Sequence, residues 1–301
     1  MSVKQASYGK DFVRVLKVIR EAEGKQTVVE MTVRTLLSVD TDEFKKSYTE
    51  GDNSLVIATD TQKNTVNVLA KQHDVQCPEV FATIVANHFV EKYSHIHVAE
   101  VSIIQNRWSR MIIDGKSHPH SFYRDGNDVR SALVTVDDKK GITIKSGIKG
   151  LLVLKSTGSA FYGFHRDELT TLAETNDRIF STKVDCQLLW NKFWTLDEVK
   201  LMKNEFMRGW NVARDVTMRI FATDESASVQ NTLYKMCCDI LRQVMKVEEV
   251  NYSLPNKHYV NVDLKPFGLR NEGKEAEVFL PLAHPSGLIT ATVARKSQGK
   301  I

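Results

Sequence analysis

The 301-residue sequence predicts an α+β protein made of two similar halves. Two observations predict this class: the spacing of apolar residues changes between period two and period 3.6, and the same order of elements occurs twice. Each half is expected to run strand, strand, helical region, strand, strand. The halves are predicted as units 1–138 and 139–301, which meet near the charged, turn-like segment Asp137–Gly141. Helices can cover one sheet face of each half, and the uncovered face indicates a larger assembly.

The first half begins with two strand-like segments. Apolar and polar residues alternate over Val13–Ile19 and again over Gln26–Leu37. Segment 77–96 follows with apolar residues at helical spacing, and Pro78 lies near its start, where proline is compatible with a first helical turn. Two further segments are predicted as the closing strands: 97–108 and 120–137.

The second half repeats this order. Segment 195–222 is predicted to be helical, with Thr195 as N-cap and Glu198 three residues later, which is the spacing of a capping box. A second helix is predicted within 226–247, with Ser228 as a candidate cap. The strand-like segments of this half are 141–157 and 178–190 before the helices and 247–264 and 277–296 after them.

Composition argues against several classes of protein. The chain is 42% hydrophobic and 26% charged, and its net charge is only +4. Because the Lys and Arg residues are spread along the chain, no basic block indicates a nucleic-acid partner. No stretch approaches the ~18 apolar residues of a membrane span. The N-terminal residues lack the apolar core of a signal peptide.

The cysteines and histidines give little support for a metal site. No CxxC pair occurs, so reduced thiols are expected at the four cysteines: Cys77, Cys186, Cys237 and Cys238. Two His-x-His pairs, His95/His97 and His118/His120, would each point to one face of a strand and could suit a metal. No third ligand supports this alternative. Segment 114–122 is predicted to be a turn with polar histidines.

Several polar motifs leave two interpretations open. Thr59 or Asp60 is expected to be the N-cap of a helix over 59–71, and a helix N-terminus is also an anion site. Lys10, at the start of the first strand, is either an ordinary solvated lysine or a functional amine. Arg178 is free to pair with an acid or to bind a ligand, and Gln230 in a first helical turn is unremarkable alone.

A row of polar residues follows Pro255, where a strand should begin. Asn256, Lys257 and His258 form either a turn or a set of groups aimed at a ligand. Asn256 and His258 are two residues apart on an extended chain, so they can share one face. Lys257 is expected to point away and is assigned no role.

Taken together, these motifs resemble the urate oxidase (uricase) family. Segment 151–178 closely resembles the signature segment of that family. Further matches occur in the same order as in the family, from Tyr8 to about Arg295: YGKD, DNSLVIATDTQKNT, NHFVEKYSHI, DGKSHPHSF, SASVQ, YSLPNKHY and HPSGLITATV. Two departures are visible, since Leu169 replaces an aromatic residue and the chain ends in GKI.

The resemblance implies a tandem tunnelling fold (T-fold) of two ββααββ units whose antiparallel sheets form a barrel, with helices outside. It implies a homotetramer around a tunnel, with active sites at subunit interfaces. The implied partners are urate and dioxygen, without nucleic acid or membrane, and the products are 5-hydroxyisourate and hydrogen peroxide. No metal or organic cofactor is expected. A peroxisomal location is implied if the source is eukaryotic, although GKI matches the targeting tripeptide poorly, and a cytoplasmic one otherwise.

The resemblance also implies a substrate-binding set. Phe161 would stack on the flat purine, because aromatic rings do so at low entropy cost. Arg178 would give two parallel N–H donors, and Gln230 would offer one donor and one acceptor. The backbone N–H of Val229 would add a donor and Ile289 an apolar wall. The remaining members of the implied set are Thr59, Asp60, through its backbone, and Asn256.

Proton removal is implied to depend on Lys10, Thr59 and His258. Lysine is a base only when neutral, which burial favours, and a threonine hydroxyl both donates and accepts. Asn256, with Thr59, would hold dioxygen or water above the ring. In the family these groups come from two subunits, so no single chain is expected to complete the site.

Three other functions remain open from the residues. A non-catalytic purine-binding or scaffold protein could keep the fold, but the intact set of Lys10, Thr59, Asn256 and His258 argues against it. A metal-dependent hydrolase of pterin-like rings would need the His-x-His pairs as ligands. A nucleic-acid-binding module is disfavoured by the modest charge.

Overall fold

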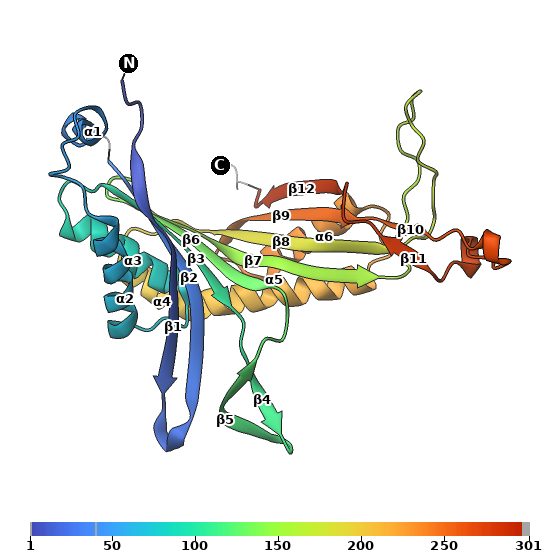
Figure 1. The fold of residues 1–301 in the computed structure, drawn as a ribbon, viewed down its shortest axis with the longest axis horizontal. Helices are drawn as coiled ribbons and strands as arrows, with labels where there is room; N and C mark the ends of the chain where they lie inside the picture. Colours follow the sequence, from blue (N-terminus) through green and yellow to red (C-terminus); the bar gives the residue numbers. More distant parts are fainter. Residues whose placement is uncertain (1, 40, 297–301) are drawn as a thin grey trace.

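A computed structural model describes residues 2–39 and 41–296 and contains one large antiparallel sheet (Figure 1). Its eight strands follow the order β1-β2-β3-β6-β7-β8-β9-β12. The strands are β1 (Ser7–Arg20), β2 (Gln26–Ser38), β3 (Val98–Asn106), β4 (Ser109–Ile113), β5 (Lys116–Tyr123), β6 (Val129–Asp137), β7 (Gly141–Lys155), β8 (Phe180–Trp190), β9 (Val247–Lys257), β10 (Tyr259–Asn261), β11 (Phe279–Pro281) and β12 (Gly287–Ala294). Two short hairpins, β4–β5 and β10–β11, extend beyond the sheet.

The helices occupy the connections between the strand pairs. They are α1 (Asp42–Thr49), α2 (Thr59–Gln72), α3 (Pro78–Lys92), α4 (Leu196–Leu201), α5 (Lys203–Thr223) and α6 (Val229–Gln243), with short 3-10 turns at Ala22–Gly24, Lys265–Phe267 and Gly273–Glu275. The order is therefore two strands, helices and two strands, repeated once, as the periodicity predicts. The turn between β6 and β7 joins the two repeats, so the sheet runs without interruption from one to the other.

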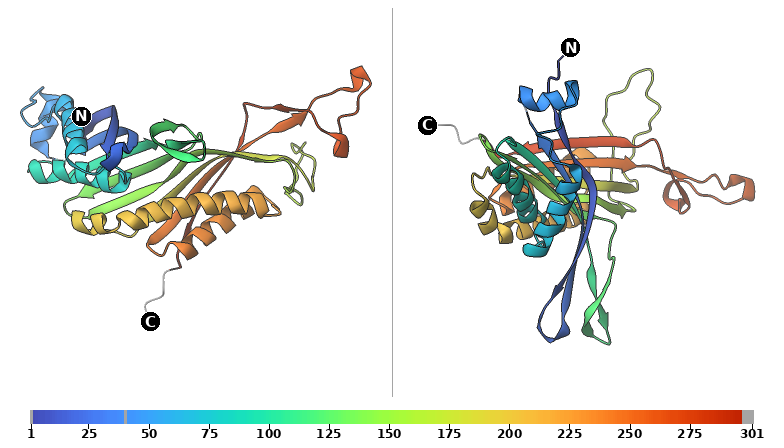
Figure 2. Two further views of the ribbon diagram at one scale, coloured as in Figure 1. Left: turned by 90° about the horizontal axis from the view of Figure 1, so that it is seen from below. Right: turned by 60° about the vertical axis from the view of Figure 1, so that its left-hand side comes forward.

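The helices cover one face of the sheet (Figure 2). Alternate residues of each long strand point into this layer, as the buried Val101 and Ile103 of β3 illustrate. Burial of this apolar face is the main driving force that holds helices and sheet together. Trp190 of β8 packs so closely against Gly209 of α5 that a Cβ on the glycine would lie 2.6 Å from the ring.

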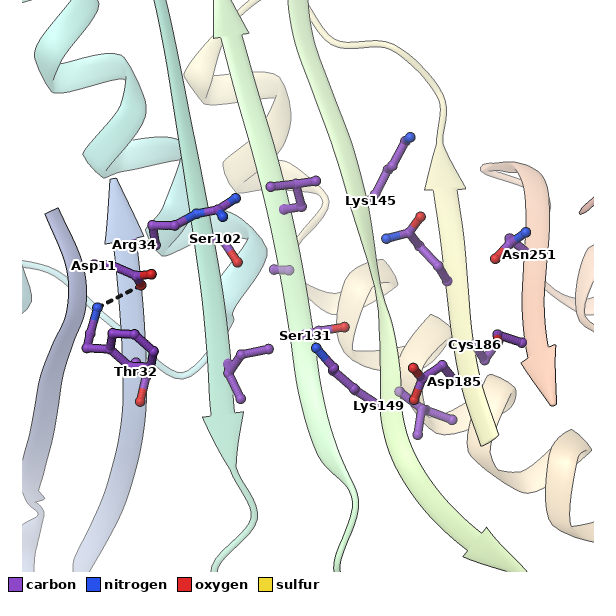
Figure 3. A pocket seen from close by; sticks show the side chains of 17 residues that line it. Asp11, Thr32, Arg34, Ser102, Ser131, Lys145, Lys149, Asp185, Cys186 and Asn251 are labelled. Carbon is purple, nitrogen blue, oxygen red and sulfur yellow. Dashed lines mark hydrogen bonds between the residues drawn. The ribbon is translucent and has the colours of Figure 1, made fainter. Parts of the chain in front are cut away.

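The opposite face of the sheet is uncovered and polar. A hollow of about 530 Å³ lies on this face and is lined by residues of β1, β2, β3, β6, β7, β8 and β9. Figure 3 shows its lining side chains. Charged side chains in it include Arg34, Lys145, Lys149 and Asp185. The sheet is not closed in the single chain, since β1 and β12 are its two edges. The sheet face that the sequence predicts to be left uncovered by helices is therefore open in the single chain.

Several predicted elements differ in detail. The helix predicted over 195–222 is divided at Met202 into α4 and α5. Segment 114–122 is not a turn: only Asp114 and Gly115 turn, and the rest forms most of β5, because the polar residues there belong to an exposed hairpin. Three predicted strands are each divided into two. The segment 120–137 is divided between β5 and β6, and 247–264 is divided at His258 between β9 and β10. The segment 277–296 is divided between β11 and β12.

Two of the three predicted helix caps are confirmed and one is wrong. The Thr195–Glu198 capping box and the Ser228 cap are present as predicted. The predicted cap at Thr59 or Asp60 is wrong, because α2 begins at Thr59 and Ala58 is the N-cap residue, with no side chain bonded to the first turn. The first N–H groups of α2 are therefore left without a side-chain acceptor.

Candidate active site

Two of the expected site residues lie on the long connection between β7 and β8, residues 156–179, which we call the β7–β8 excursion. Phe161 pairs with Thr175 across this excursion through two backbone hydrogen bonds, of 2.8 and 3.0 Å. The pairing brings Arg178 beside Phe161, so that the guanidinium carbon lies 5.1 Å from the ring centroid. Burial lowers the pKa of Arg178 from its high ordinary value. Within the part of the chain that the structure describes, Arg178 has no carboxylate partner, which leaves its donors free for a ligand.

The same excursion is joined to the start of α6. The backbone N–H of Ala160 donates to the Ser226 carbonyl at 2.8 Å, and that of Ser226 donates to the Gly158 carbonyl at 3.1 Å. Ser228 then caps α6 by accepting the N–H of Asn231 at 3.2 Å. Val229 is buried and Gln230 is exposed in the first turn. Because the pairing of Ser159 with Ser226 holds these segments together, the Phe161 side and the α6 N-terminus form one unit.

Asn256 and Ile289 come from the last two strands of the sheet. Asn256 of β9 lies between Thr182 of β8 and Gly287 of β12 and is only 9% exposed. A Cβ on Gly287 would lie 3.7 Å from Ile289 and 3.8 Å from Asn256, so these two side chains flank the glycine. His258 follows at the end of β9, where its carbonyl accepts the N–H of Leu282 at 2.9 Å.

A cavity of about 750 Å³ opens between the β7–β8 excursion and the end of β9, and Phe161, Val229, Gln230 and Ile289 are not among the described residues that line it. Arg178, Asn256 and His258 line it, together with Thr175 and Asp177 from the excursion. Its other walls come from the β10–β11 hairpin and its flanking residues. Lys257, which is expected to point away, is also among the residues that line this cavity. A cavity with a guanidinium, an amide and an imidazole suits a planar anion.

The first-half residues form a separate group at the junction of β1 and α2. The backbone N–H of Lys10 donates to Thr35 Oγ1 at 3.3 Å, and the Thr35 hydroxyl donates to Gln62 Oε1 at 2.8 Å. Gln62 Nε2 in turn donates to the Ile57 carbonyl at 3.3 Å, just before α2 begins. The start of α2, with Thr59, is thus tied to Lys10 through buried hydrogen bonds.

Two further features define this junction of β1 and α2, which we call the β1–α2 corner. Lys10 immediately precedes a β-bulge, which re-aims the strand between Lys10 and Val13. The Asp60 carboxylate accepts hydrogen bonds from Lys63 Nζ at 2.5 Å and from Asn64 Nδ2 at 2.9 Å. The hydrogen bond from Lys63 is the largest cause that lowers the pKa of Asp60, and the charge of Lys10 also contributes. The Asp60 side chain is therefore already occupied, and only its backbone remains for a ligand.

Thr35 and Gln62 are residues that the sequence analysis missed. Both side chains are fully buried. The signal was present in the periodicity, since Thr35 stands between Val33 and Leu37 on the buried face of β2, and Gln62 stands one turn before Val66 on the buried face of α2. A polar residue at an apolar position indicates a buried hydrogen bond.

The single chain keeps these two groups apart. Lys10 lies on β1, at one edge of the sheet, whereas Asn256 and Ile289 lie on β9 and β12, at the other edge. In Figure 1, α2 and β1 are on the left, and β10 and β11 extend to the right. The described residues that line the cavity beside Arg178 all come from the second half of the chain.

The histidine pairs do not form a metal centre. In the described ranges, 2–39 and 41–296, no group of three His, Cys, Asp or Glu side chains could hold a metal ion. His118 and His120 share one face of β5, as predicted for a strand, with ring centroids 4.6 Å apart. His97 is paired with Asp138 at 2.7 Å. All four cysteines are free.

The repeat of strands and helices on one antiparallel sheet defines the class of protein, a tandem T-fold. The family model described as Uricase matches residues 6–135 and 144–290. The chain is 54% identical to a uricase of Aspergillus flavus, over 98% of each chain. It is 47% identical to a uricase of Schizosaccharomyces pombe, again over 98% of each. The chain belongs to the uricase family.

Solved structures give the same result. The crystal structure of the uricase from Arthrobacter globiformis matches with a TM-score of 0.86 and 35% identity, covering 99% of this chain and 96% of that one. The uricase from Bacillus fastidious matches with a TM-score of 0.79 at 23% identity and shows the shared fold. Family membership over nearly the whole chain places this protein among the urate-oxidising enzymes. No helix of the described residues is both long and apolar enough to cross a membrane.

Proposed function

We propose that this enzyme oxidises urate with dioxygen and water to 5-hydroxyisourate and hydrogen peroxide, without a metal or organic cofactor. Two electrons pass from the purine to dioxygen, two protons complete hydrogen peroxide, and water supplies the new hydroxyl. The observation that carries the proposal is the convergence of Phe161, Arg178, Asn256 and His258 around one end of the sheet. These groups match the flat shape, the negative charge and the carbonyl groups of urate.

The second-half residues are proposed to bind the purine. Phe161 gives a stacking face, and the unpaired guanidinium of Arg178 donates two parallel N–H bonds to a carbonyl and a ring nitrogen. Gln230 and the N–H of Val229 face the amide edge of the purine from the start of α6, and Ile289 closes the site as an apolar wall. A purine that lacks one of these carbonyl groups would leave a donor unpaired, which disfavours its binding.

The first-half residues are proposed to remove the proton that makes urate electron-rich enough to reduce dioxygen. Lys10 acts as the base, Thr59 passes the proton, and His258 extends the relay. Asn256 holds dioxygen or water above the ring, with Thr59 on its other side. The uncapped first turn of α2 supports this role, because its free N–H groups and helix dipole favour an anion beside Thr59 and the backbone of Asp60.

The separation of the two groups supports a site shared by two subunits. Lys10 and Thr59 of one protomer would meet Arg178, Gln230 and the other binding residues of its partner when the edges β1 and β12 pair between copies. The β10–β11 segment exposes Phe267 at 76% and Leu280 at 54%, which is apolar surface that a partner would cover. We propose a homotetramer with the open sheets joined into a barrel.

A peroxisomal location is proposed on the same family grounds. The fungal relatives are eukaryotic proteins. The C-terminal GKI lies outside the described residues. A fluorescent protein fused ahead of the intact C-terminus should co-localise with a peroxisomal marker, and a variant without GKI should not. A diffuse signal from both fusions would place the enzyme in the cytoplasm.

Loss of urate absorbance under air, with hydrogen peroxide measured in parallel, tests the reaction. We expect one peroxide for each urate consumed, at a rate that is unchanged after exhaustive treatment with a chelator. Abolition of activity by the chelator would favour a metal-dependent enzyme. Urate binding without consumption would favour a non-catalytic purine-binding protein.

A further inference from the structure

The base of the β7–β8 excursion is closed by one carboxylate. Asp177, on the returning side, accepts a hydrogen bond from Thr157 Oγ1 at 2.6 Å and one from the Gly158 N–H at 2.8 Å, both on the outgoing side. The carbonyl of Asp177 also accepts the Thr175 hydroxyl at 2.6 Å. Asp177 thus joins the two ends of the excursion directly beside Arg178.

Electrostatics support a stable closure. The hydrogen bond from Thr157 is the largest cause that lowers the pKa of Asp177, and the backbone N–H groups of Gly158, Ser159 and Arg178 act in the same direction. Burial opposes them. Hydrogen bonds to an ionised acceptor are stronger than those between neutral groups. Because Gly158 has a φ of 76°, a conformation that glycine adopts readily, the chain can turn sharply around the carboxylate.

Beyond this base, the Ala160 N–H bonds to the Ser226 carbonyl, and the two sides of the excursion are joined to each other by short-range contacts. Arg166 bonds to the Leu172 carbonyl at 3.0 Å, and the Gly163 N–H bonds to Glu174 at 3.0 Å. Leu169 is 82% exposed at the far end, which Figure 1 shows standing away from the sheet. The spacing between Phe161 and Arg178 is therefore set by the Phe161–Thr175 pairing together with the Asp177 bonds at the base, and not by the outer part of the excursion.

We propose that Asp177 is a positioning residue for the purine: by holding Thr157 and Gly158 it sets Phe161, Arg178 and the start of α6 at the spacing that one flat ligand requires. The link to α6 runs through Gly158, whose carbonyl accepts the Ser226 N–H. Asp177 acts through Arg178 and is not itself a catalytic residue. This inference rests on the proposed function, since the spacing matters only if these residues hold urate.

Asp177→Asn in the full chain tests the inference. Asparagine keeps the size of the side chain but removes its charge and one acceptor oxygen. We expect the Kd for urate, measured under nitrogen so that no turnover occurs, and the KM under air to rise about 10-fold, as for the loss of one or two charge-assisted hydrogen bonds. The kcat should stay within about 2-fold, because the proton-relay groups are untouched. Peptides spanning 156–178 should exchange amide hydrogens faster.

Asp167→Asn is the matched control. Asp167 lies in the same excursion, and among the described residues its carboxylate accepts bonds from nearby Leu169 and Thr170, at 3.0 and 2.8 Å. The Kd for urate and the exchange at the base should equal those of the wild type.

Thr157 gives a second test that survives if Asp177→Asn fails to fold. Thr157→Val should raise the Kd by less than Asp177→Asn, Thr157→Ser should restore it, and the double variant Asp177→Asn/Thr157→Val should be no weaker than Asp177→Asn alone. Wild-type Kd and exchange rates in both Asp177→Asn and Thr157→Val would overturn this inference and leave the proposed function intact. A wild-type chain that neither binds nor oxidises urate would overturn both.

Discussion

The two ends of the sheet hold their polar groups in different ways. At the β1–α2 corner, Lys10 and Thr59 are connected through Thr35 and Gln62, which are fully buried and hydrogen-bonded. At the far end, Arg178 stands on an excursion outside the sheet, whose two sides are joined by Asp177 at the base and by the Phe161–Thr175 pairing just beyond it. The comparison indicates that the two ends of the sheet differ in role, with proton transfer proposed at the first end and purine recognition at the second. Proton transfer needs atoms held to within a fraction of an ångström, which the buried hydrogen bonds of the first end provide, whereas the recognition groups of the second end are positioned by hydrogen bonds at the surface.

The largest expected effect comes from the rigid corner. Lys10→Met should lower kcat at least ~100-fold and change KM by less than about 3-fold, because a general base contributes on the order of 10²- to 10⁴-fold to the rate and little to binding. Steady-state kinetics with urate measure both values. Lys17→Met, on the same strand, is the control and should be active. A rise in KM alone would move Lys10 from the relay to the binding set and break the comparison.

Subunit complementation tests whether the two ends meet across an interface. Lys10→Met and Arg178→Ala should each be nearly inactive. When the two are denatured, mixed in equal amounts and refolded together, about a quarter of the sites would combine an intact Lys10 with an intact Arg178, as expected for random pairing at isologous interfaces. The specific activity of the mixture should recover to about that fraction of wild type. No recovery, with wild type refolding well, would show that the site lies within one chain.

A smaller effect is expected at the recognition end. Arg178→Lys should weaken urate binding by about 1–3 kcal/mol, because a lysine cannot make two parallel bonds. Equilibrium binding under nitrogen measures it. Arg166→Lys is the matched control in the same excursion, since the Arg166 guanidinium contacts the Phe164 ring and the Leu172 carbonyl there. Unchanged affinity in Arg178→Lys would contradict the proposed pose.

The smallest effect on catalysis is expected when a buried hydrogen bond that holds the β1–α2 corner is removed. Gln62→Leu removes the acceptor of the Thr35 hydroxyl and should lower the free energy of unfolding by about 1–3 kcal/mol, with a reduced kcat and an unchanged Kd for urate. Denaturant unfolding and kinetics measure these quantities. Gln72→Leu makes the same change at an exposed position of α2 and should be neutral. If Gln62→Leu altered the Kd but not kcat, the assignment of chemistry to this corner would fail.

Much of the fold follows from local pattern. The alternation in β2 and the helical spacing in α3 are properties of neighbouring residues, and they predicted the repeated order correctly. The Thr195–Glu198 cap is likewise visible within four positions of sequence. The sequence does not predict the break at Met202, because no glycine or proline marks it. It does not predict β5 as a strand either, because the residues of this exposed hairpin are mostly polar and lack an apolar alternation.

The candidate site divides in the same way. Resemblance to the uricase family selected its residues one by one, and the family assignment is confirmed. Periodicity alone could not have grouped Arg178 with His258, because they are 80 positions apart in the sequence and come together only through the β8–β9 register.

The sequence by itself therefore determined the strand and helix order, the buried face of each long element and the chemical groups available for a purine. Only the tertiary structure decided that Lys10 and Asn256 lie at opposite edges of the sheet, that Gln62 bonds to Thr35, and that Asp177 closes the excursion. The reason is physical: side-chain periodicity and capping act over a few residues, whereas strand register and buried hydrogen bonds depend on how distant segments pack.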